Sequence, residues 1–183
     1  VGLAGLVVFL VIVGAQQQVN PYLTEELGVS ISQIGMITSL WGIGIVVGSI
    51  VASALMKRLN MKHAFLIMLA AIALSLAALS MFIRAQYGLA LAVGLVILYG
   101  AAYGIGQTIS FALCMRVVDS RIAASMFAIL MAFTNVGQGI GLALSGALAD
   151  AAGFRVTLLV FAALPFLVLP LLPSVFRKQA DQD

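Results

Sequence analysis

The chain has 183 residues, of which 63% are hydrophobic and only 8% carry a charge. A soluble domain needs about 25% charged residues, so this composition excludes one and places the chain in a lipid bilayer. The small net charge of +3 gives no reason to expect a nucleic-acid partner.

Charged or turn-forming segments divide the chain into six apolar runs. Because a bilayer leaves no water to hydrogen-bond the backbone, runs of this length are predicted to be transmembrane helices. The expected fold is therefore all-α, a polytopic membrane protein with one six-helix bundle over 1–175 and a cytoplasmic tail over 176–183. The runs are 1–22, 33–56, 64–83, 88–115, 123–149 and 156–175.

The basic residues predict an orientation. If the N-terminus is cytoplasmic, seven basic residues lie inside and only Arg84 and Arg155 lie outside, as the positive-inside rule requires. The C-terminus is then cytoplasmic as well. The seven inside residues are Lys57, Arg58, Lys62, Arg116, Arg121, Arg177 and Lys178.

The first run ends in amide side chains. At 3.6 residues per turn, Gln16, Gln17 and Asn20 fall on one arc, and Gln18 points nearly the other way, where it needs a separate partner or the headgroup region. The three can line a shared cavity. Two alternatives stay open: hydration at the membrane interface, or hydrogen bonds between helices.

The fourth run carries a polar stripe at helical spacing: Tyr99, Tyr103, Gln107, Ser110 and Cys114. Such a stripe in a membrane helix typically borders water or a ligand. We favour cavity lining over structural hydrogen bonding for Tyr99, Tyr103 and Gln107.

In the fifth run, Thr134, Gln138, Gly141 and Ser145 share an arc, and Asn135 lies at its edge. We add Asn135 and Gln138 to the candidate cavity.

Glycines recur at four-residue spacing in three runs. Small residues at this spacing let two helices approach closely. We predict helix packing at Gly44, Gly48, Gly100, Gly104, Gly137 and Gly141.

The third and sixth runs are the least polar, and we expect them to face lipid broadly. In the sixth, Pro165, Pro170 and Pro173 are expected to distort the helix. A turn is predicted at Gly153, between Asp150 and Arg155.

No ionisable residue lies clearly in the middle of a run, so no proton-carrying site is evident. No catalytic motif is present, and Cys114 is the one cysteine. The sequence therefore predicts a protein that is not an enzyme and needs no metal and no cofactor.

The pattern of six helices with a short basic loop after the second resembles one half of a major facilitator superfamily transporter. The segment LTEELGVSISQIGMITSLWGIGIVVGSIVASALMKRLNMKHAFL is similar to the outer loop, second helix and inner loop of a half. In the inner-loop motif, Ser53, Lys57 and Asn60 occupy the Gly, Asp and Gly positions. The segment from Leu98 to Arg155 looks most like the AmpG-type branch, which includes muropeptide permeases and acetyl-CoA transporters.

This resemblance implies a C-terminal half that works by alternating access, as a symporter of the bacterial inner membrane. A second six-helix half, either preceding sequence or another copy, would complete it, and Val1 inside an apolar run fits a partial sequence. The expected ligand is a small polar organic solute. The alternative is a helical bundle that assembles with other proteins and transports nothing.

Overall fold

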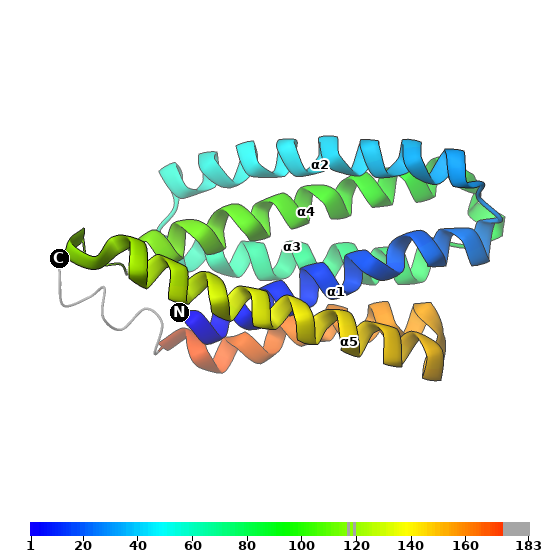
Figure 1. The fold of residues 1–183 in the computed structure, drawn as a ribbon. Coiled ribbons are helices and arrows are strands. Elements are labelled where there is room, and N and C mark those ends of the chain that lie inside the picture. The colour runs from blue at the N-terminus through cyan, green and yellow to red at the C-terminus, as the bar shows by residue number, and fades with distance from the viewer. Residues whose placement is uncertain (117, 119, 174–183) are drawn as a thin grey trace.

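The computed structural model describes residues 1–116, 118 and 120–173, and every regular element among them is helical (Figure 1). The predicted tail, 176–183, lies outside the described residues. The long helices are α1 Gly2–Leu27, α2 Ile31–Arg58, α3 Met61–Phe82, α4 Gly88–Arg116 and α5 Ala123–Ala163. Short 3-10 segments are η1 Ala85–Tyr87, η2 Ser120–Ile122 and η3 Leu164–Leu171.

Local sequence signals fix the first turns between helices. Gly28 ends α1 in the left-handed conformation, with φ 61°, which a residue without a Cβ adopts without strain. Ser30 then caps α2 through a reciprocal pair: its backbone N–H donates to Gln33 Oε1 at 2.9 Å, and its Oγ accepts from the Gln33 N–H. Asn60 caps α3 by accepting from the His63 N–H at 3.0 Å.

The fifth predicted run forms the first arm of α5, before Gly153. The sixth predicted run forms the second arm of α5, after Gly153, together with η3. Among the described residues, five helical stretches are long and apolar enough to cross a membrane, and the last covers Ala123–Pro170. Gly153 breaks it with φ 82° and ψ 162°, which confirms the predicted turn, and the chain folds back on itself there (Figure 1). Gly14 lies against both arms, at Gly141 and Phe161. Two of the three prolines of the sixth run, Pro165 and Pro170, lie in the tighter 3-10 segment η3, and Pro173 follows it.

Glycines hold α2 and α4 in close contact. A Cβ on Gly44 or Gly48 would overlap a backbone carbonyl oxygen of α4, at Ile97 or Ala101. Conversely, a Cβ on Gly100 or Gly104 of α4 would overlap a carbonyl oxygen of α2. The two backbones therefore approach as closely as glycine permits, from both sides.

A second glycine contact joins α1 to the first arm of α5. A Cβ on Gly137 would overlap the carbonyl oxygen of Leu6, and one on Gly141 would overlap that of Leu10. Both pairs run parallel in Figure 1, so the bundle is built from two closely packed helix pairs with α3 behind them.

The position of α3 corrects one expectation. Half of its most apolar stretch is buried, against 17% for α2. One face of α3, including Phe65, Ile72 and Leu79, packs into the core, while Leu74 on the other face is 71% exposed. The sequence does not distinguish the buried face of α3 from its exposed face, because lipid-facing and core-facing side chains are equally apolar in a membrane protein.

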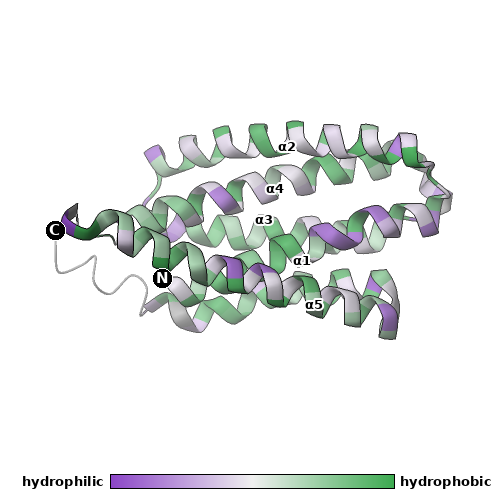
Figure 2. Cartoon of the chain, in the orientation of Figure 1, coloured by the Kyte–Doolittle hydropathy of each residue, from purple (hydrophilic) through white to green (hydrophobic). Residues whose placement is uncertain are grey.

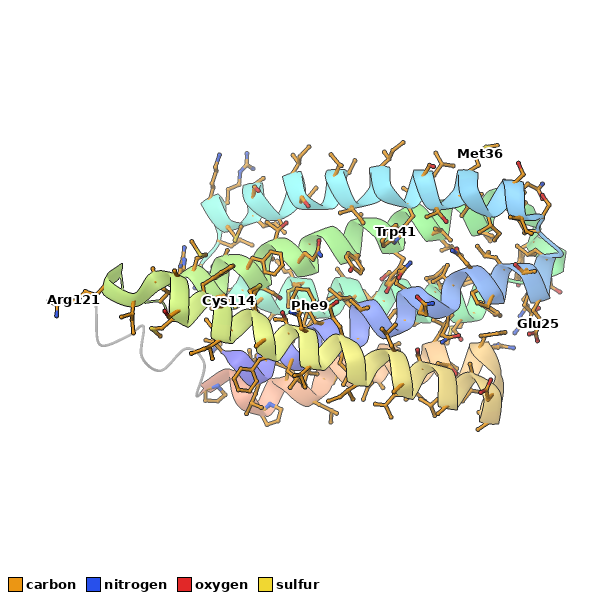
Figure 3. The ribbon with its side chains drawn as sticks, in the orientation of Figure 1. Phe9, Glu25, Met36, Trp41, Cys114 and Arg121 are labelled. Carbon is orange, nitrogen blue, oxygen red and sulfur yellow. The ribbon has the colours of Figure 1, made fainter. Side chains whose placement is uncertain are left out.

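Charged residues collect at the two ends of the bundle. The end that holds the N-terminus carries the basic residues, and the opposite end carries acidic residues beside two arginines; Figure 3 labels Arg121 and Glu25 at the two extremes. The first group comprises Lys57, Arg58, Lys62, Arg116 and Arg121, and the second comprises Glu25, Glu26, Arg84, Asp150 and Arg155. Asp119 lies outside the described residues.

The α2–α4 contact makes a stability prediction. Gly48→Ala should lower the free energy of unfolding by about 1–3 kcal/mol, because the added methyl group forces the helices apart. Gly42→Ala, in the same helix, is the control because nothing lies within 4 Å of the added Cβ. Reversible unfolding in mixed micelles measures both, and equal stability of the two variants would contradict the packing.

Candidate functional site

Some intramembrane polar side chains are paired inside the bundle. Gln18, which points away from the other amides of α1, donates from Nε2 to Ser145 Oγ at 2.9 Å, so its separate partner lies on α5. The Tyr99 hydroxyl donates to the Ile12 carbonyl at 2.6 Å and is fully buried. These bonds satisfy groups that would otherwise be costly in an apolar interior.

The amides on the other side of α1 are more open. Gln17 is exposed, and Gln16 and Asn20 are half-buried. Asn20 Nδ2 approaches Thr38 Oγ1 of α2 at 3.5 Å, a long and weak hydrogen bond.

The predicted stripe on α4 divides along its length. Tyr103 and Gln107 are half-buried, whereas Tyr99, Ser110 and Cys114 are buried. The structure therefore places Tyr99 in the protein interior, between α1 and α4, and not on an open cavity wall. Of the buried stripe positions, Tyr99 faces α1 and Ser110 faces α3, where the Ser110 hydroxyl lies 3.9 Å from Met68 Sδ.

On α5, Asn135 is exposed and Gln138 is half-buried, and Gln138 Nε2 donates to Asn135 Oδ1 at 3.3 Å. This bond lies within one helix and leaves both amides free to make others. Figure 2 shows the hydrophilic stretches on α1, α4 and α5 against largely apolar ribbons.

A small cavity lies between α1, α2 and α4, with room for about one water molecule, about 10 Å³. We call it the Trp41 cavity. It is lined by Gln16, Val19, Asn20, Thr38, Trp41 and Val96.

An open groove of about 500 Å³ lies beside it, at the end of the bundle that carries Glu25. Asn20 borders both spaces. The rest of the groove is lined by Pro21, Thr24, Glu25, Ile31, Ile34 and Phe154.

Trp41 and Thr38 are not among the candidate residues that the sequence predicts. The Trp41 ring lies edge-on against Tyr103, with centroids 5.2 Å apart and planes at 71°. The signal that could have found it is helical spacing, since Trp41, Gly44 and Gly48 share the face of α2 that packs on α4.

The fold and these polar positions define a polytopic membrane protein with a partly polar interior face. The chain belongs to the Major Facilitator Superfamily, whose family model matches residues 2–182. A curated relative, a gallate transporter from Pseudomonas putida, is 30% identical over 154 residues. That alignment covers 84% of this chain and 33% of the relative, so the chain spans about a third of its length. No solved structure matches.

The buried tyrosine makes a prediction about its role. Tyr99→Phe should destabilise the bundle by about 1 kcal/mol, because it removes the hydrogen bond that joins α4 to α1. Tyr103→Phe is the matched control, since its hydroxyl makes no hydrogen bond to the described residues. Unfolding in mixed micelles compares them, and a Tyr103 variant that loses as much stability would refute the assignment.

Proposed function

We propose that this chain is a six-helix half, the C-terminal one, of a secondary transporter that moves a small polar organic solute by alternating access. The second half would be either a segment outside this chain or another copy of it. Membership of the superfamily supports transport, as does the relative described as a gallate transporter.

One observation carries this proposal. Amide side chains on three helices, α1, α4 and α5, are at least partly exposed and make no hydrogen bond to another helix within the described residues. Gln17 and Asn135 are exposed, and Gln16, Gln107 and Gln138 are half-buried. An amide facing hydrocarbon loses hydrogen bonds worth several kcal/mol. Water, a solute or a second half would supply those bonds.

The chemistry of this polar face suits a solute rich in hydroxyl or amide groups. The candidate cavity residues are neutral donors and acceptors: Gln16, Gln17, Asn20, Tyr103, Gln107, Asn135 and Gln138. They recognise orientation and shape more than charge. Muropeptides of the AmpG-type branch and gallate both carry such groups, and gallate is the first solute to test.

We also propose that both termini are cytoplasmic and that the membrane is a bacterial inner membrane. The segregation of five basic residues to one end of the described bundle supports this orientation. If transport is symport, the coupling ion would bind mainly in the second half, because the described spans place no charged side chain at mid-depth.

The second candidate function is an assembly or interaction bundle without transport. The Gln18–Ser145 and Tyr99–Ile12 hydrogen bonds favour it, because both are interhelical and buried. It assigns no role to the open amides, so substitution of those amides distinguishes the two functions.

Uptake of radiolabelled gallate into cells that express the complete transporter tests the proposal. Replacing both Tyr103 by Phe and Gln107 by Leu should lower the initial rate at least about tenfold, because each change removes a hydrogen-bonding group worth about 1 kcal/mol. Gln86→Leu, at an exposed position in the short η1 segment, is the control. If the double variant takes up gallate at the wild-type rate, the assignment of Tyr103 and Gln107 to the solute cavity is wrong. If the wild type takes up no gallate, gallate is not the solute.

A further inference from the structure

Three cations gather where α2 ends and α3 begins. Lys57 and Arg58 lie in the last turn of α2, and Lys62 lies in the first turn of α3. All three side chains are exposed, and within the described part of the chain none of them forms an ion pair. Each therefore presents a positive charge that no described residue neutralises.

Glycine packing brings a fourth cation to the same end of the bundle. Gly104 of α4 packs against the backbone of Ile45 on α2, and the two helices run in the same direction. From this contact α2 continues for 13 residues to Arg58, and α4 continues for 12 residues to Arg116, which is also exposed. The two helices therefore end at about the same level (Figure 1). We call the four cations the basic cluster: Lys57, Arg58, Lys62 and Arg116.

The helices that carry the basic cluster supply no counter-charge. No Asp or Glu occurs between Glu26 and Asp119, so α2, α3 and α4 contain no acidic residue. The opposite end of the bundle differs, because Tyr22 there lies within electrostatic reach of Glu26 as well as of Arg84 and Arg155. The arginines at that end thus have a carboxylate in their neighbourhood. The cations of the basic cluster need a negative charge from outside their three helices.

An exposed apolar strip leads along α2 to the basic cluster. Ile50 and Val51 are 65% and 42% exposed, and they lie seven residues before Lys57 and Arg58, on the same face of the helix. The 28 residues of α2 extend over about 42 Å, which exceeds the hydrocarbon thickness of about 30 Å. The two apolar residues therefore lie at the depth of the acyl chains, whereas the cations that follow them reach the headgroups.

A phospholipid with a net negative charge matches both features. Its phosphate faces the cations, and its acyl chains lie along the apolar strip. Lys and Arg clusters just outside a transmembrane helix attract anionic headgroups. A zwitterionic phospholipid carries the same phosphate, but its own ammonium group cancels the net attraction.

We propose that the basic cluster binds the headgroup of an anionic phospholipid. This partner is distinct from the transported solute, so the inference stands or falls independently of the proposed function.

The test measures binding of soluble short-chain lipids to the complete transporter in neutral detergent micelles. Dioctanoyl phosphatidylglycerol has a net negative charge, dioctanoyl phosphatidylcholine has none, and glycerol phosphate supplies the phosphate without acyl chains. Native mass spectrometry resolves individual bound lipids and gives the affinities. The wild type should bind phosphatidylglycerol at least about tenfold more tightly than phosphatidylcholine. It should not bind glycerol phosphate over the same concentration range.

Neutralising variants of the complete transporter locate the lipid. Combining Lys57→Gln, Arg58→Gln and Lys62→Gln should lower the affinity for phosphatidylglycerol to that for phosphatidylcholine, because the charge attraction is lost. Combining Arg84→Gln and Arg155→Gln, which removes cations from the opposite end, is the matched control and should keep the preference. Lys62→Gln alone, at an exposed position, should reduce the preference about fivefold, so the test does not depend on the triple variant.

Three results would overturn the inference. Equal affinity of the wild type for the two lipids would show that another group, such as a carboxylate of the second half, neutralises the basic cluster. Binding of glycerol phosphate as tight as that of phosphatidylglycerol would show a site for a free anion. An unchanged lipid preference in the triple variant and in Lys62→Gln would place the lipid elsewhere.

Discussion

The structure depends on one constraint: a polar side chain at membrane depth must be hydrogen-bonded by protein or reached by water. This constraint sorts the amides and hydroxyls of the bundle into two groups. Gln18 and Tyr99 find partners on neighbouring helices. Gln17, Gln107 and Asn135 do not, and they lie at exposed or half-buried positions. The first group stabilises the bundle, and the second is the basis for proposing a solute path.

Glycine packing provides the frame on which both groups are arranged. The α1–α5 and α2–α4 pairs approach so closely that an added methyl group would overlap a facing carbonyl. This contact sets the rotation of each helix about its axis and therefore the direction in which its polar side chains point. Trp41 illustrates the effect, because the approach of Gly100 fixes the indole beside Tyr103.

Hydropathy and periodicity predicted much of the fold. They predicted the helices, the turn at Gly153 and the opposite direction of Gln18, because span length and helical angle follow directly from sequence. The structure also brings the predicted glycines against facing backbones.

Two features could not be read from the pattern. The burial of α3 was missed because core and lipid faces share one composition. The stripe on α4 was assigned as a unit, although Tyr99 turns inward and Gln107 does not. A helical wheel shows which residues share a face, but only the neighbouring helices decide what that face contacts.

The central claim is that the open amides border water or a solute and not lipid. In a Cys114→Ala background, Gln107→Cys and Asn135→Cys would be treated in membrane vesicles with a charged, water-soluble thiol reagent. Leu74→Cys, on the exposed apolar face of α3, is the matched control. The account predicts that the first two variants are modified and the control is not. Absence of modification at both amide positions, or equal modification of all three variants, would contradict it.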